Sequence, residues 1–163
     1  MNIALIGPSG TEKAAISRLL AKSMDKKLIS TDEELKKTIK LSASKFIKIY
    51  GLERLRTVET DVVENITNLD ECIFDAGEGV VMRNENIINL KRDGLIIFLT
   101  ANTKILASSR KISRNPSNAF PNINFPEFEA KCKKAADYTI DISNLTPEEA
   151  CGLISHYVQM EIQ

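Results

Sequence analysis

The sequence predicts an α/β fold in which helices cover both faces of one parallel β-sheet. Two observations lead to this prediction. Short apolar runs without charged residues, such as 2–6 and 95–99, are typical of strands that are buried on both faces. These runs alternate with segments whose apolar residues recur at helical spacing, and such alternation is typical of parallel strands joined by crossover helices. We expect residues 1–163 to form a single domain.

Local signals in the first half of the chain predict several helix limits. The apolar residues of 12–24 recur at helical spacing, which predicts a helix. Thr31 and Glu34 have the Ser/Thr-x-x-Glu spacing of a capping box, so a helix is expected to begin there. Gly51 separates two further helices. The elements expected in this half are strands 2–6 and 27–29 and helices 12–24, 42–50 and 52–66, with the helix from Thr31 between them.

The second half of the chain predicts further strands, helices and a long loop. Residues 113–126 contain three prolines and four asparagines, and loops of this length are often functional lids. The last helix is expected to have Thr146 as its N-cap, Pro147 at its first position and Glu149 at its third. The other elements expected in this half are strands 72–75, 95–99 and 138–142 and helices 85–91, 104–112 and 127–136.

The composition argues against several classes of function. The chain balances 22 Lys and Arg against 22 Asp and Glu, whereas a dedicated duplex-DNA binder needs a net basic face. It has no Trp and few other aromatic residues, which disfavours a stacking platform for single-stranded nucleic acid. No apolar run is long enough to span a bilayer and no signal peptide is recognised, so we expect a cytoplasmic protein that binds no membrane.

Cysteine and histidine are too few to predict a structural zinc site, which needs four ligands close in space. Cys72, Cys132 and Cys151 are widely spaced and are expected to be free thiols, the last two as small buried hydrophobic residues. The one histidine, His156, lies on the predicted last helix and is a poor candidate for the base of a hydrolase.

The segment from Gly7 to Ala14 lies between the first strand and the first helix, where a phosphate-binding P-loop belongs. In that motif backbone N–H groups surround a phosphate and a lysine reaches the outer phosphates. Gly7, Gly10 and Lys13 have the required spacing. Glu12, however, replaces the glycine before the lysine, and Ala14 replaces the hydroxyl residue that binds Mg²⁺. The loop alone is compatible with a nucleotide site and with a turn that binds nothing.

Four segments, in their order and spacing, resemble those of the shikimate kinase family. Residues 7–13, with Leu-Leu-Ala-Lys at 19–22, resemble its P-loop and following helix. Ser30-Thr-Asp-Glu resembles its Asp-Thr-Asp-Glu loop. Residues 50–59 resemble its Gly…Phe-Arg-x-x-Glu helix, and residues 77–81 resemble its Gly-Gly-Gly-Val-Val loop. The resemblance runs from the first strand to the last helix.

This resemblance implies a P-loop kinase fold of the nucleoside-monophosphate-kinase type, with a five-stranded parallel sheet. It implies ATP and Mg²⁺ as cofactors and phosphoryl transfer to the 3-hydroxyl of shikimate or to a similar small hydroxylated acid, within aromatic amino acid biosynthesis. Helices within 31–66 would bind the acceptor, and 113–126 would form the lid. We expect a monomer that binds a nucleotide and a small acid, with no nucleic acid partner.

The resemblance also implies roles for single residues. Asp32 would hold acceptor hydroxyls, and Arg56, oriented by Glu59, would hold the acceptor carboxylate. Lys13, Asp32 and Arg114 would be catalytic, with Arg114 near Pro116 only an approximate match to the lid arginine. The residues expected around the nucleotide are Gly7, Gly10, Thr11, Glu12, Lys13, Ala14 and Arg110 (or Lys111), and those around the acceptor are Asp32, Arg56, Gly77, Glu78 and Gly79. The competing interpretation of Lys13, Asp32, Arg56 and Glu59 is solvated or paired helix charges.

The departures from the family pattern all move charge against phosphoryl transfer. Ser30 stands where the family has an aspartate that helps to hold Mg²⁺, and Glu78 replaces the middle glycine of the triple-glycine loop. Phe128 aligns with an arginine that holds the acceptor carboxylate. No metal ligand is assigned with certainty. Asp75, at the end of the third strand, could rebuild part of a Mg²⁺ shell through water or could simply cap the strand.

Three hypotheses follow from these residues. The first is a diverged shikimate-kinase-like protein with a degenerate P-loop, in which ATP-dependent transfer is weakened or lost. The second is a binding or regulatory module on the same fold, without catalysis. The third is a kinase for a neutral or amine-bearing molecule, because Glu78 and Phe128 disfavour a carboxylate.

Overall fold

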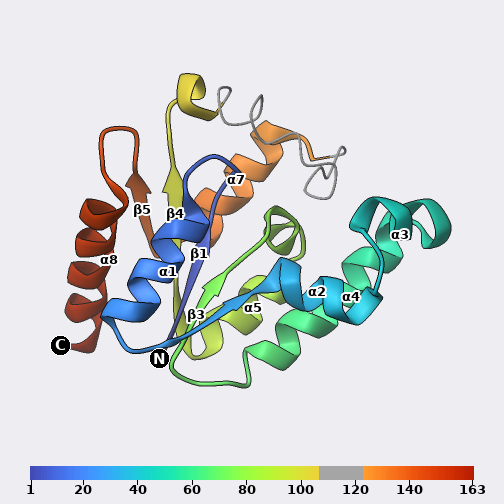
Figure 1. Ribbon diagram of the computed structural model, residues 1–163, viewed down its shortest axis with the longest axis horizontal. Helices are drawn as coiled ribbons and strands as arrows, with labels where there is room; N and C mark the ends of the chain where they lie inside the picture. The colour runs from blue at the N-terminus through green and yellow to red at the C-terminus, as the bar shows by residue number, and fades with distance from the viewer. Residues whose placement is uncertain (107–122) are drawn as a thin grey trace.

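The centre of the molecule is a sheet of five parallel strands. The computed structural model describes residues 1–106 and 123–163, and within them the strand order is β2-β3-β1-β4-β5 (Figure 1). The strands are β1 (Asn2–Ile6), β2 (Lys27–Ser30), β3 (Cys72–Asp75), β4 (Gly94–Thr100) and β5 (Tyr138–Asp141). All neighbours pair in parallel, which confirms the predicted fold class, and the expected strand limits are correct to within one residue.

Helices connect the strands and pack on the sheet. Those with both ends in the described residues are α1 (Lys13–Ser23), α2 (Thr31–Ile39), α3 (Ala43–Tyr50), α4 (Leu52–Ile66), the 3₁₀-helix η1 (Glu78–Met82), α5 (Asn84–Arg92), α7 (Phe125–Ala135) and α8 (Pro147–Ile162). α8 begins as predicted, with a capping box between Thr146 and Glu149. The 3₁₀-helix was not expected, because its sequence has no periodic signal.

Both faces of the sheet are covered, as predicted. Successive residues of β1 alternate between them. Ala4 and Ile6 pack in one apolar cluster with α4, α5 and α7, whereas Ile3 and Leu5 pack in another with α1 and α8. This alternation follows from the two-residue period of a strand, and it explains why β1 has no polar face in the sequence.

A third apolar cluster lies away from the sheet and joins α2, α3 and α4. Its buried residues are Leu35, Phe46, Leu55 and Val62. Figure 1 shows these helices gathered at the opposite side of the molecule from α8. The N-terminal end of α4 is thereby held near the loop that follows β3, and α4 packs against η1.

Two local expectations were wrong. The N-cap of α2 is Ser30, whose Oγ accepts a hydrogen bond from Glu33 N–H at 3.3 Å, and not Thr31. The predicted lid 113–126 ends too late, because Phe125 and Pro126 already belong to α7. An asparagine N-cap followed by proline at an early helical position begins that helix two residues before the expected start.

Part of the predicted lid lies outside the described residues. Of the expected helix 104–112 only 104–106 is described, and it is helical. Arg110, Lys111, Arg114 and Pro116 fall within 107–122, so their expected roles stay predictions.

The three cysteines are free, and Cys132 and Cys151 are buried, as expected; Cys72 is buried as well. Burial raises the pKa of each thiol, that of Cys132 to about 12, so none is a reactive thiolate near neutral pH. Within residues 1–106 and 123–163, no helix has both the length and the apolar character to cross a membrane.

Candidate functional site

The candidate site lies where β1, β2 and β3 end. In the sheet register Asp75 pairs with Leu5 of β1 and with Ser30 of β2, so the loops that follow these three strands start side by side. Ligands of open parallel sheets bind outside the carboxyl ends of the strands. The predicted phosphate loop, Asp32 and the Gly77–Gly79 loop all meet at this edge.

A hydrogen bond within the first loop and two glycines determine its shape. Thr11 is fully buried, and its Oγ donates a hydrogen bond to the carbonyl of Pro8 at 2.9 Å. Gly7 has φ +145° and lies against the backbone of Leu99. Gly10 also has positive φ. The predicted loop between strand and helix is therefore present.

Glu12 has a left-handed backbone, with φ 55° and ψ 28°, at the start of α1. This conformation costs an L-residue with a side chain roughly 1–2 kcal/mol and costs glycine almost nothing. The backbone therefore has the geometry that explains a glycine in the P-loop motif, although the residue is Glu. The side chains of Glu12 and Ala14 both reach solvent.

Lys13 is fastened to the end of β3. Its Nζ donates hydrogen bonds to Asp75 Oδ1 at 2.8 Å and to the carbonyl of Ala76 at 2.6 Å. Both partners of the ion pair are largely shielded from solvent. Asp75 is thus neither a free metal ligand nor a simple strand cap, because its carboxylate holds the lysine of the first loop.

The Gly77–Gly79 loop touches both predicted acceptor residues. Gly77 N–H donates to Thr31 Oγ at 2.8 Å, and a Cβ at Gly77 would lie 2.1 Å from Asp32 Oδ1. A Cβ at Gly79 would lie 2.1 Å from Arg56 Nη1. A side chain at either glycine would force the carboxyl of Asp32 or the ion pair of Arg56 to move. Asp32 and Arg56, which are 24 positions apart in sequence, are therefore placed beside one loop.

Arg56 and Glu59 form a buried ion pair at the predicted acceptor position. Arg56 Nη1 donates to Glu59 Oε1 at 3.2 Å, and the two side chains are 8% and 2% exposed. Burial raises the pKa of Glu59 to about 7, although Arg56 opposes that shift. Glu59 Oε2 is buried and has no hydrogen-bond partner within residues 1–106 and 123–163. The interpretation of this pair as exposed helix charges was wrong, because α4 turns both side chains into the protein.

Glu78 lies on the same loop but points to the first loop. Its Oε1 accepts hydrogen bonds from Ser9 N–H at 2.7 Å and from Ser9 Oγ at 2.8 Å. Backbone N–H groups of such a loop are the donors that bind phosphate oxygens. A carboxylate oxygen of the chain itself therefore lies where the oxygen of a bound anion is expected.

Asp32 lies in an unfavourable electrostatic environment for a carboxylate. Although Asp32 reaches solvent, the protein atoms packed around its carboxyl remove part of its hydration and raise its pKa. Asp75 and Glu78 raise that pKa further, and Lys13 lowers it. The site thus gathers three carboxylates around one lysine.

Three positions at this edge that the family resemblance links to Mg²⁺ have no side-chain oxygen or one that is already engaged. Ala14 has no side-chain oxygen, Ser30 Oγ is used as a helix cap and Asp75 is paired with Lys13. In the part of the chain that the structure describes, no group of three or more His, Cys, Asp and Glu could hold a metal ion. Lys13 and the backbone N–H groups of the first loop are the kinds of donor that bind phosphate oxygens.

Phe128 belongs to the core and not to an acceptor pocket. It is 1% exposed and packs in the cluster that contains Val80 and Val81 of η1. Cys132, one turn later on α7, is fully buried in the same cluster. The side chain that aligns with a carboxylate-binding arginine is therefore unable to contact a bound acceptor.

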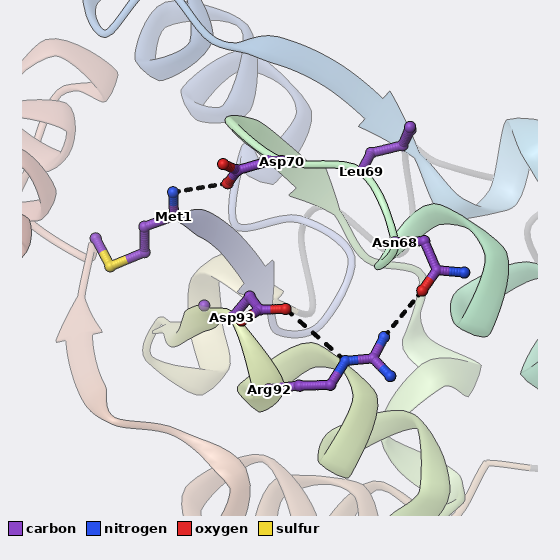
Figure 2. Close-up of a pocket in the computed structure, with 7 residues that line it drawn as sticks. Met1, Asn68, Leu69, Asp70, Arg92 and Asp93 are labelled. Atoms are coloured by element: carbon purple, nitrogen blue, oxygen red, sulfur yellow. Dashed lines mark hydrogen bonds and ion pairs between the residues drawn. The ribbon is translucent and has the colours of Figure 1, made fainter.

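A hollow lies outside this site, near the start of β1. Figure 2 shows its lining, which includes Met1, Asp70 and Arg92. The Met1 ammonium pairs with Asp70 at 2.8 Å, and Arg92 Nη2 donates to Asn68 Oδ1 at 3.3 Å. These charged groups already pair within the protein, so they are not available to bind a charged ligand.

The family of the chain follows from comparison with known proteins. The family model described as shikimate kinase matches residues 9–158. The chain belongs to the shikimate kinase family. A shikimate kinase of Caldicellulosiruptor bescii is 31% identical over 159 residues, which cover 94% of this chain and 92% of that protein. One of Thermodesulfovibrio yellowstonii is 31% identical over 161 residues, with the same coverage.

Solved structures of shikimate kinases have the same fold. The enzyme of Acinetobacter baumannii in complex with shikimate has a TM-score of 0.86 at 20% identity, and the match covers 98% of this chain and 93% of that one. The enzyme of Aquifex aeolicus has a TM-score of 0.81 at 21% identity, with 99% and 98% covered. These similarities confirm the P-loop kinase fold.

The structure brings together most of the residues that the sequence singled out. Asp32 lies close enough to Lys13, Asp75 and Glu78 for their charges to shift its pKa. The pair of Arg56 and Glu59 lies beside the same loop, at Gly79. Two contributors were missed, namely Ser9, which binds Glu78, and Thr31, which binds the backbone of Gly77. Nothing in the sequence signals either contact, because both join loops that are more than 40 residues apart.

The tight packing at Gly79 can be tested with a matched pair of substitutions. Gly79→Ala is expected to lower the free energy of unfolding by about 1–3 kcal/mol, because its Cβ overlaps the buried ion pair. Gly152→Ala on α8 meets no described atom within 4 Å and should raise it by about 0.5–1 kcal/mol, as alanine does in a helix. Urea unfolding measures both, and a Gly79→Ala chain as stable as the unmodified one would contradict the packing.

Proposed function

We propose that this chain is a diverged shikimate kinase homologue that still binds a nucleotide and a small hydroxylated acceptor. Its ATP-dependent phosphoryl transfer is weaker than that of ordinary members of the family. The first loop with Lys13 binds the phosphates, and the acceptor lies beside Asp32 and Arg56. We further propose that the chain works as a single-domain monomer in the cytoplasm.

One observation carries this proposal, namely that the Gly77–Gly79 loop contacts both halves of the site. Gly77 and Gly79 lie against Asp32 and Arg56, while Glu78 binds Ser9 of the first loop. An acceptor held beside Asp32 and Arg56 would therefore face the phosphates held by the first loop. Phosphoryl transfer depends mainly on such positioning and on neutralising charge.

The same contacts support a weakened reaction. Transfer requires cations and a metal around the phosphates. Here Lys13 is already paired with Asp75, Ala14 offers Mg²⁺ no ligand, and Glu78 adds a negative charge between the two halves. Each of these features raises the barrier for a negatively charged phosphoryl group.

A coupled assay with ATP, Mg²⁺ and shikimate tests the proposal. The turnover number is expected to be lower by at least about a hundredfold than that of the Caldicellulosiruptor bescii relative assayed in parallel. Lys13→Met should remove the residual rate, which separates it from a contaminating kinase. Turnover equal to that of the relative would refute the weakened transfer. If calorimetry detects no binding of ATP, ADP or phosphate at millimolar concentration, the result favours a binding module without catalysis.

A second candidate function is transfer to a neutral or amine-bearing acceptor. The observation that favours it is the negative charge around the acceptor position. Asp32 and Glu78 each place a carboxylate there, and Glu59 already pairs with Arg56. Phe128, in the core, supplies no cation there. A screen of neutral polyols and amino alcohols in the same assay, with shikimate as reference, distinguishes the two candidates by which acceptor gives the higher kcat/KM.

A further inference from the structure

The contact between Glu78 and Ser9 has a consequence for which nucleotide this site binds, and the inference rests on the proposed function. The two hydrogen bonds share one carboxylate oxygen, Glu78 Oε1, and their donors are Ser9 N–H and Ser9 Oγ. Ser9 belongs to the loop of the phosphates, whereas Glu78 belongs to the loop that touches Asp32 and Arg56. The side chain therefore spans the space between donor and acceptor.

The transferred phosphate has to lie in that same space. Its oxygens must face the acceptor hydroxyl on one side and the first loop on the other, because the entering and leaving oxygens are roughly in line. The inner phosphates of a nucleotide lie deeper, at the backbone that leads into α1, while Lys13 reaches towards the outer ones. Glu78 thus competes with the outermost phosphate and leaves the places of the inner ones open.

We infer that the Glu78 carboxylate occupies the position of the terminal phosphate, so that the site prefers a nucleoside diphosphate or pyrophosphate over a nucleoside triphosphate. Glu78 is then a specificity-determining residue of this chain. For a triphosphate to bind fully, the Glu78 side chain has to leave Ser9. The hydrogen bonds that a triphosphate gains from Ser9 therefore only replace the hydrogen bonds that Ser9 loses when Glu78 is displaced.

Contacts of neighbouring residues fix the backbone at Glu78. The Glu78 carboxylate lies close enough to Asp32 and to the Cys132 thiol to add to the rise in the pKa of both groups. Asn86 Nδ2 donates to the carbonyl of Val80 at 2.9 Å and Gly77 N–H donates to Thr31, which together fix the backbone on both sides of Glu78. The backbone position is therefore set by other contacts, and the side chain can be changed alone.

Calorimetric titrations with ATP, ADP and pyrophosphate, without added Mg²⁺, test the inference. In Glu78→Gly the dissociation constant for ATP is expected to fall by at least about tenfold, while those for ADP and pyrophosphate change by less than about threefold. Glu78→Gln, which keeps the size and removes the charge, should give an intermediate fall. Glu64→Gln, at an exposed position of α4, is the matched control and should change none of the constants.

The outcomes separate the inference from the proposed function. Equal gains for ATP and ADP, or no gain for ATP, would overturn the terminal-phosphate position of Glu78 while nucleotide binding itself stands. If no ligand binds to any variant, the nucleotide site and the inference are both wrong. Thermal unfolding of each variant without ligand checks that the chain folds, and Glu78→Gln serves if Glu78→Gly does not.

Discussion

A chain that carries Glu12→Gly and Ala14→Ser together is expected to bind ATP with Mg²⁺ at least about tenfold more tightly than the unmodified protein. At about 4 Å and an effective dielectric constant of about 20, two unit charges interact by about 4 kcal/mol. Glu12 reaches solvent, so screening reduces this repulsion to a part of that value. The serine adds the hydroxyl oxygen that Mg²⁺ uses in P-loops. Calorimetry with and without Mg²⁺ measures the gain.

Single substitutions divide this gain into its causes. Glu12→Asn removes the charge, and asparagine tolerates the left-handed backbone at this position. It should therefore recover only the electrostatic part of the gain in ATP affinity. Ala14→Ser should help only when Mg²⁺ is present. Ala130→Ser, at an exposed position of α7, is the control for a new hydroxyl and should change nothing. Affinities that stay unchanged in the double variant would mean that this loop no longer has the geometry of a phosphate site.

The buried pair of Arg56 and Glu59 is expected to respond asymmetrically to truncation. Glu59→Leu should lower the free energy of unfolding at pH 8 by about 3–5 kcal/mol, because the buried guanidinium loses the carboxylate that faces it and an arginine cannot lose its proton. Arg56→Met should cost less, since Glu59, whose pKa burial already raises to about 7, can take up a proton. Urea unfolding of both variants at pH 6 and pH 8 measures the difference.

The raised pKa of Glu59 also fixes the sign of a pH dependence. The folded chain holds this proton up to about pH 7, whereas the unfolded chain releases it near 4.5. The contribution of Glu59 to stability is therefore fully present below pH 4.5 and is lost as the pH rises to about 7, by about 3 kcal/mol in all. Glu59→Gln should remove this slope. An unchanged slope in Glu59→Gln would show that another group titrates.

The sequence was sufficient for the centre of the sheet, because β1, β3 and β4 are short, mainly apolar runs. It was also sufficient for α8, whose Thr146, Pro147 and Glu149 form a local start signal. It failed at α2, where Ser30 caps the helix while the Thr31 hydroxyl accepts a hydrogen bond from Gly77 N–H instead. Choices of this kind depend on residues that are distant in the sequence.

The sequence predicted which residues lie in the candidate site but not which side chains pair with each other. The family resemblance pointed to Lys13, Asp32 and Arg56, yet the partner of Lys13 is Asp75 and that of Glu78 is Ser9. An ion pair depends on side-chain directions that no spacing encodes. The left-handed backbone of Glu12 could be expected, because the motif has glycine there. The burial of Arg56 and Glu59 could not be expected from the sequence, since their spacing of three residues is equally typical of exposed helix pairs.

The most direct test titrates the unmodified protein with ATP, first in the presence of a chelator and then with an excess of Mg²⁺. The arrangement of Glu12, Ala14 and Glu78 predicts a dissociation constant in about the millimolar range, near 4 kcal/mol of binding free energy, that Mg²⁺ lowers by less than about threefold. A dissociation constant in about the micromolar range that requires Mg²⁺ would contradict the obstructed phosphate site.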